Sequence, residues 1–146
     1  MTTPRLIADL RADEGCRLEA YPDPLTGGSP WTIGCGHTGL EVRPGLVWTE
    51  AQAEEALTSD LAAVCRALDA RLPWWRQLDD ARQDVLANMA FNLGVGGLLR
   101  FGQTLESIRA RRWDAAANGM LASAWAGQVG ARARRLAEQM RTGARP

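Results

Sequence analysis

Two acidic residues near the start of the chain lie where the local sequence can hold a carboxylate in place. Glu14 directly precedes Gly15, the expected end of a helix. Asp23 lies between Pro22 and Pro24. Pro24 restricts Asp23 to extended conformations and Pro22 has a fixed φ, so holding this carboxylate loses little entropy. Two such groups can flank a glycosidic bond, where one protonates the leaving oxygen and the other acts on water or on the developing cation.

A threonine downstream of these acids fits the same chemistry. Residues 31–37, WTIGCGH, alternate as one strand would, which places the Thr32 hydroxyl on a face otherwise made of bare glycine backbone. Such a face lets a bulky ligand come close, and a hydroxyl beside a carboxylate can position a water molecule for attack. The opposite face is apolar and predicts core. The competing interpretation is that Glu14 and Asp23 are ordinary surface acids.

The elements that carry these residues follow from capping and alternation. A helix is predicted from Pro4, with Thr3 as its N-cap, to a stop at Gly15. Two strands and a loop are then expected: RLEAY and WTIGCGH as strands, the turn-rich PDPLTGGSP between them, and residues 38–47 as loop.

A long helix is predicted after this part. Thr49 begins it, and Gln52 stands three residues later in the position of a capping box. Apolar residues recur with helical spacing to about Arg71, before Pro73. Further helical patterns cover Asp79–Leu93, Gly102–Arg111, Arg112–Ala122 and Ala131–Arg141.

These elements predict an α+β fold that is mainly α. We expect a single domain, residues 1–146, made of two lobes. The N-terminal lobe (about 1–48) holds a small sheet, a connecting helix spans about 49–71, and the C-terminal lobe (about 72–146) is all helical. A cleft between two such lobes is a natural place for an extended polymer, and hinge motion about the connecting helix would open it.

Composition limits the class of protein. The chain has 146 residues, of which 46% are apolar and 23% charged, ordinary values for a compact domain. No apolar run is long enough to span a bilayer. Arg5, Asp9 and Arg11 interrupt the N-terminal segment, so it lacks the apolar core of a secretory signal. We therefore expect synthesis and folding in the cytoplasm, with export by outside help.

Charge is distributed unevenly although the net charge is zero. From Arg100 to Pro146 nine arginines face three acids, and residues 1–99 carry the balancing negative charge. A basic lobe could attract an anionic polymer such as cell-wall glycan or nucleic acid; the alternative is two solvated faces.

The three cysteines, Cys16, Cys35 and Cys65, contain no CxxC pair, and the chain has one histidine. A structural zinc site is therefore not expected, and no organic cofactor is implied either. Buried free thiols are the expectation for a protein folded in the cytoplasm. Whether Cys16 and Cys35 bond is left open by the sequence.

Two stretches of the chain carry a family resemblance. EGCRLEAYPD followed by WTIGCGHT resembles the signature of the phage lysozymes, glycoside hydrolase family 24, with its Glu–Asp–Thr triad. The segments DDARQDVLANMAFNLGVGGLLRF and RRWDAAANGMLASAWAGQVGARARRLAEQMRTG are similar to the C-terminal lobe of T-even phage lysozymes, nearly without gaps. The turn between Asp23 and Thr32 is longer than in the family, and the stretch between His37 and Thr49 is shorter. The resemblance implies a two-lobed, lysozyme-like fold.

The same resemblance implies the activity and the roles of three residues. The chain would be an endolysin that hydrolyses the β-1,4 bond between N-acetylmuramic acid and N-acetylglucosamine of peptidoglycan. Glu14 would be the general acid, Asp23 the partner carboxylate and Thr32 the group that orients water. Family members of this type generally invert the anomeric carbon, so Asp23 would act through water and not as a nucleophile. Glu14 must be protonated to donate, which calls for a partly desolvated site.

Supporting residues are carried over in the same way. Arg132 matches the family arginine that approaches the catalytic glutamate, and we expect it to tie the two lobes together. His37 lies on the core face of its strand, and Asp60 matches the family partner of that histidine. The two are expected to form a structural ion pair.

Positions that match family substrate contacts are Thr38, Phe91 and Thr104. Phe91 equally continues the apolar face of its helix, which favours packing. Trp113 and Trp125 are expected in the core of the helical lobe. Trp74 and Trp75 either stack on a sugar or pack at the end of the connecting helix.

Other functions fit these residues less well. A lytic transglycosylase cleaves the same bond with one glutamate, but Asp23 and Thr32 have no place in that chemistry. A catalytically silent wall-binding module has no need of all three groups. A nucleic-acid binder would use the basic C-terminal stretch, which has no recognisable docking motif. The expected partners are a peptidoglycan strand and a separately encoded holin that releases the enzyme to the cell wall or periplasm; we expect a monomer that binds no nucleic acid.

Overall fold

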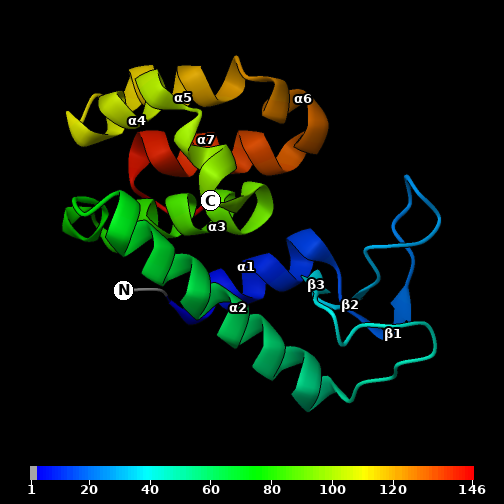
Figure 1. Ribbon diagram of the computed structural model, residues 1–146. Helices are drawn as coiled ribbons and strands as arrows, with labels where there is room; N and C mark the ends of the chain where they lie inside the picture. The colour runs from blue at the N-terminus through cyan, green and yellow to red at the C-terminus, as the bar shows by residue number, and fades with distance from the viewer. Residues whose placement is uncertain (1–2) are drawn as a thin grey trace. The chain divides into compact units, whose positions relative to one another are not determined.

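The computed structural model describes residues 3–146, which form two compact units (Figure 1). The N-terminal unit comprises Pro4–Ala63, and the C-terminal unit comprises Val64–Pro146 together with Thr3. The elements are α1 (Pro4–Glu14), β1 (Arg17–Tyr21), β2 (Thr32–Gly34), β3 (His37–Thr38), α2 (Glu50–Arg71), the 3₁₀ helix η1 (Trp75–Gln77), α3 (Asp80–Leu99), α4 (Gly102–Arg109), α5 (Trp113–Leu121), α6 (Ala124–Val129) and α7 (Ala131–Thr142). This composition of elements confirms the predicted α+β, mainly α fold.

Helix α1 begins and ends where the sequence predicts. It starts at Pro4, and after Glu14 the backbone enters the left-handed region at Gly15, with φ of +68°. The N–H of Gly15 donates to the carbonyl of Arg11 at 3.0 Å, which closes the last turn. Thr3, the expected N-cap, donates its hydroxyl to Asp84 Oδ2 at 2.7 Å.

The sheet of the N-terminal unit is antiparallel, in the order β1-β2-β3. The expectation of one continuous strand over residues 31–37 is wrong, because the chain turns back after Gly34 and β3 begins at His37. Gly34, the last residue of β2 (φ +64°), and Gly36 (φ +86°) both adopt the left-handed conformation, which ends the extended strand. Ile33 consequently pairs with His37 across the turn.

The predicted loop at 38–47 closes the core of this unit. Its backbone joins β1, since the N–H of Ala20 donates to the carbonyl of Leu46 at 2.9 Å. The resulting cluster is small and apolar, as expected for the inner face of a short sheet. It contains Ala20, Ile33 and Val42, with Trp31, Leu46 and Trp48 packed against them.

The long helix α2 has the predicted cap. Thr49 Oγ1 accepts from the N–H of Gln52 at 3.2 Å, and Gln52 Oε1 accepts from the N–H of Thr49 at 2.8 Å. This reciprocal pair is a capping box, and it fixes the start of a helix that ends at Arg71. One stripe of the helix is buried: Ala53, Leu57, Leu61, Cys65 and Leu68.

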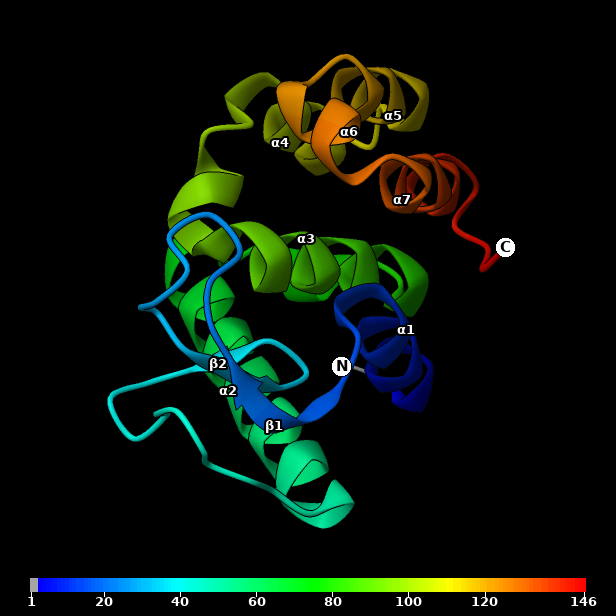
Figure 2. The ribbon, with the colours of Figure 1, turned by 90° about the vertical axis from the view of Figure 1, so that its right-hand side faces the viewer.

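The C-terminal unit is all helical. Its central helix, α3, is capped by Asp79, whose side chain accepts from the N–H of Arg82, and it continues past a non-helical Gly94 to Leu99. Helix α5 packs on α7 and on α4, and Figures 1 and 2 show α5 and α7 side by side. Helix α6 was not predicted.

Of residues 3–146, no single helix is long and apolar enough to span a membrane. Only α3 and α4 taken together, with a bend of 107° between them, meet the criteria of length and composition.

Candidate active site

Glu14 is the last residue of α1, and its side chain is half-buried. The turn between β2 and β3 approaches it closely. A Cβ built on Gly36 would lie 3.5 Å from Oε2 of Glu14, which is ordinary van der Waals contact. The bare backbone at Gly36 therefore forms one wall beside the Glu14 carboxyl group.

A disulfide joins Cys16 to Cys35. The expectation of free thiols is wrong for these two residues and right for Cys65, which is free and buried. Burial raises the pKa of the Cys65 thiol. The bond follows from the pairing of Arg17 with Gly34, which brings the neighbouring cysteines opposite one another. It links the segment after Glu14 to the β2–β3 turn.

Asp23 lies in the turn between β1 and β2. Figure 2 shows that this turn extends beyond the ends of the two strands. Its Oδ2 accepts backbone N–H groups from Leu25 at 3.2 Å and from Thr26 at 3.0 Å. Its own N–H donates to the carbonyl of Gly28 at 2.9 Å. These local bonds hold the half-buried carboxylate in addition to the flanking prolines.

Thr32 begins β2 at the end of the sheet from which this turn departs. It pairs with Tyr21 on one side and with Thr38 on the other. Residues directly opposite in antiparallel strands point to the same face, so the hydroxyls of Thr32 and Thr38 share a face with Tyr21. Asp23 lies two residues beyond Tyr21. The N-terminal unit thus holds the three expected catalytic residues at one sheet and the adjacent helix end.

His37 lies between two carboxylates. Its Nδ1 is 2.7 Å from Asp60 Oδ2, and its Nε2 is 2.7 Å from Glu41 Oε1. Asp60 is the partner expected from the sequence, whereas Glu41 was missed because it lies in the predicted loop. Burial alone would lower the pKa of His37, but the hydrogen bonds to Glu41 and Asp60 outweigh it and raise that pKa above 6.5. The same bond lowers the pKa of Glu41 below 4.5.

The His37 cluster should make stability depend on pH. The raised pKa of His37 contributes stability that is fully present below pH 6.5 and is lost as pH rises through the higher folded value. The lowered pKa of Glu41 contributes stability that is present above pH 4.5 and is lost as pH falls through the lower folded value. We expect the melting temperature to decline above pH 6.5 in the native chain and to decline less in His37→Asn. An equal decline in both proteins, followed by circular dichroism, would contradict this.

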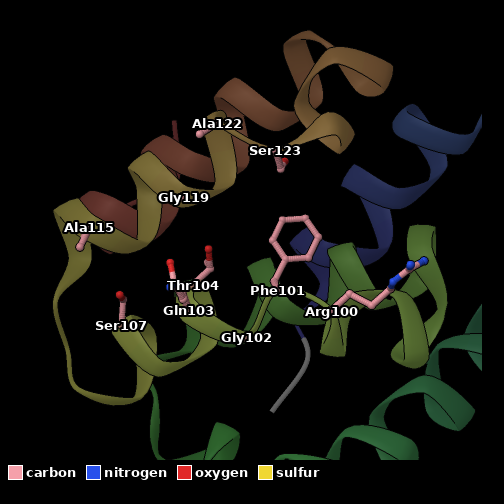
Figure 3. Close-up of a pocket in the computed structure, with 10 residues that line it drawn as sticks. All are labelled: Arg100, Phe101, Gly102, Gln103, Thr104, Ser107, Ala115, Gly119, Ala122 and Ser123. Atoms are coloured by element: carbon pink, nitrogen blue, oxygen red, sulfur yellow. The ribbon is translucent and has the colours of Figure 1, made fainter.

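The C-terminal unit contains a cavity of about 560 Å³ between α4 and α5 (Figure 3). Thr104 lines it, as does Phe101 at the start of α4. Gly119 faces Thr104 from α5, and a Cβ at this position would collide with the Thr104 hydroxyl. Phe91, on α3, is half-buried and does not line this cavity. Of the three expected substrate contacts, Thr104 and Phe91 belong to this unit and Thr38 to the other.

Arg132 is a buried residue of α7, and its Nε donates to Asn88 Oδ1 at 3.0 Å. Its role toward Glu14 stays a prediction.

Trp125 is buried as predicted, and its N–H donates to Asn92 Oδ1 at 2.8 Å. Trp113 is only half-buried.

The two tryptophans after α2 differ from each other. Trp75 is buried and donates its N–H to Asp69 Oδ1 at 2.7 Å, so it packs. Trp74 is half-buried.

Within residues 3–146, no three His, Cys, Asp or Glu side chains form a group that could hold a metal ion.

Comparison with known proteins finds a family match and several similar proteins, among them lysozymes and endolysins. The phage lysozyme family profile matches residues 11–138. The chain is 33% identical to the pre-baseplate central spike protein Gp5 of Enterobacteria phage T4, over 92% of this chain and 27% of that protein. It is 28% identical to probable T4-type lysozyme 1 of Dictyostelium discoideum, over 92% of both chains. It is 31% identical to the endolysin of Bacillus phage B103, over 77% of this chain and 41% of that protein.

The family match contains Glu14, Asp23 and Thr32, and it runs through both units, into α7. It therefore covers the sheet, the long helix and nearly all of the helical unit. The chain belongs to the phage lysozyme family.

Proposed function

We propose that this chain is a muramidase of the endolysin type, which hydrolyses the β-1,4 bond between N-acetylmuramic acid and N-acetylglucosamine in peptidoglycan. The observation that carries the proposal is the family match over residues 11–138. The local structure supports it, because Glu14 ends a helix beside a bare glycine backbone and Asp23 is fixed in a hydrogen-bonded turn.

In the proposed reaction, Glu14 donates its proton to the glycosidic oxygen as the bond to the anomeric carbon breaks. A water molecule attacks that carbon from the opposite face and passes its proton to Asp23. The Thr32 hydroxyl orients the water. Because the two N–H bonds from Leu25 and Thr26 hold Oδ2 of Asp23, its other oxygen is left to act on the water.

Further residues complete the proposal. Thr38, Phe91 and Thr104 contact the glycan strand, Arg132 acts on Glu14, and His37 with Asp60 holds the sheet against α2. The chain acts as a single lysozyme-like domain and as a monomer, without a cofactor. It is made in the host cytoplasm and reaches the cell wall or periplasm when a separately encoded holin opens the membrane, which leads to host lysis.

The products distinguish this activity from that of a lytic transglycosylase. We expect digestion of purified sacculi to give muropeptides with hydrated reducing ends, since water is the attacking group. Because the bond cleaved is β, inversion should give the α anomer first, visible by NMR before mutarotation. Mass spectrometry that finds 1,6-anhydro ends would overturn the hydrolysis, and a β anomer as first product would overturn the inversion alone.

A further inference from the structure

A second cavity lies in the C-terminal unit, apart from every residue placed in the proposed reaction. It has a volume of about 270 Å³ and is lined by Trp74, Gln77, Leu78, Arg109 and Arg111. Trp74, Gln77 and Leu78 come from the segment between α2 and α3. The two arginines come from the end of α4 and the residues after it.

The cationic groups of this cavity are not neutralised. Within residues 3–146, the side chains of Arg109 and Arg111 form no hydrogen bond or ion pair, and the indole N–H of Trp74 has no acceptor. The lining residues include no carboxylate.

Two acids on the segments that flank Trp74, Gln77 and Leu78 are bonded to other residues. Asp69 accepts from Arg76 at 2.9 Å and from the indole of Trp75 at 2.7 Å. Asp79 accepts from Arg82 at 3.1 Å. Neither acid is therefore bonded to the arginines of the cavity, whose side chains remain available to a ligand or to solvent.

The backbone at Arg111 is the second independent feature. Arg111 has a φ of +61° and is the only non-glycine residue with a positive φ in the described part of the chain. It follows the end of α4, and the N–H of Arg112 donates to the carbonyl of Ser107 at 2.8 Å across it. Helices commonly carry glycine at such a position, because an L side chain is strained there. This chain instead has a long cationic side chain at that position, beside the cavity.

The donor set indicates the class of ligand. A guanidinium group matches the oxygens of a phosphate or carboxylate with two parallel N–H bonds. An indole offers a flat apolar face for the C–H face of a sugar ring and one N–H donor at its edge. The cavity is slightly smaller than the usual small-ligand site, which suits a single sugar and not a polymer segment.

We propose that this cavity binds a sugar unit that carries an oxyanion, held by Arg109 and Arg111 with its ring against Trp74. Two kinds of ligand carry an oxyanion on a sugar ring: a phosphorylated sugar and a sugar acid. The inference goes beyond the proposed hydrolysis and does not depend on it.

Binding is tested on the full chain by NMR, with the indole N–H signal of Trp74 assigned by its loss in Trp74→Phe. The probes are glucose 1-phosphate and glucuronate, with neutral glucose and inorganic phosphate as controls. We expect the signal to shift with at least one anionic sugar, and the better of the two identifies the source. Equal binding of glucose, or of phosphate alone, would overturn the assignment, as would no response to either anionic sugar.

Arg111→Gly removes the cation without harming the fold, since glycine suits the positive φ. We expect its melting temperature to be unchanged or higher, and its affinity for the anionic sugar to fall at least about 10-fold. Arg109→Gln should weaken binding similarly. The matched control is Arg112→Gln, which removes the same charge one residue away and outside the cavity lining. Equal losses in Arg112→Gln would show general charge attraction and refute the site.

Discussion

Glu14→Gln should lower the rate of peptidoglycan hydrolysis by about 100- to 10,000-fold, the usual contribution of a positioned general acid. Glutamine keeps the size and shape of the side chain but has no acidic proton to give to the leaving oxygen. The half-buried position of Glu14 and the close approach of Gly36 are retained by the isosteric change. Turbidity of outer-membrane-stripped bacteria measures the rate, and circular dichroism verifies the fold.

A matched control is available on α2. Glu54 is an exposed glutamate of the same unit, so Glu54→Gln should clear cell walls at the native rate. Asp23→Asn should also be strongly impaired, because the water loses its proton acceptor. If Glu14→Gln and Asp23→Asn both clear cell walls at the native rate, the roles assigned to these two carboxylates are wrong; if the native chain binds sacculi without clearing them, it is a wall-binding module. Sedimentation with sacculi separates loss of binding from loss of catalysis.

Helix α2 was predictable from the sequence because its signals are local. The Thr49–Gln52 capping box involves residues three apart, and the apolar spacing continues to Leu68. The end of α1 at Gly15 depends on a similarly local signal. Helix α6 was missed because it is six residues long, too short to show a period.

The β2–β3 turn was missed for a different reason. Alternation in WTIGCGH fits a strand, and glycine is compatible with both a strand and a left-handed turn. The choice is made by tertiary contacts. Gly34 must lie against Trp48, where an added Cβ would be 3.0 Å from the indole ring. Because Gly34 and Trp48 are 14 residues apart in the sequence, the apolar alternation of WTIGCGH cannot reveal this contact.

Part of the candidate site was likewise predictable. Proline on both sides of Asp23 indicated a fixed carboxylate, and the structure adds the N–H bonds from Leu25 and Thr26 that the sequence did not reveal. Asp60 was identified as the partner of His37 through the family resemblance, whereas Glu41 was not. Exposed charged residues in loops form such contacts only through the path of the backbone, which sequence spacing does not determine.

Breaking the Cys16–Cys35 disulfide should have the second large effect. The bond closes a segment with a sequence separation of 19 residues, for which chain entropy predicts a loss of about 3 kcal/mol in the free energy of unfolding. The melting temperature should fall by roughly 10 °C for a chain of this size. Two equivalents of a small thiol convert the bond to two cysteine thiols and oxidised reductant, and the Cys16→Ser/Cys35→Ser variant should reproduce that state.

The same change should lower kcat more than it raises KM. Gly36 follows Cys35 and lies against the Glu14 carboxyl group, and Cys16 is two residues from Glu14, so the bond fixes both sides of the proposed acid. On the release route proposed above, the bond would form only in an oxidising compartment, and activity would then rise with release. Cys65→Ala, which retains the disulfide, is the control and should respond to reductant as the native chain does. If reduction leaves both the melting temperature and kcat unchanged, the disulfide has no part in holding Glu14, because the hydrogen bonds between β1 and β2 already suffice.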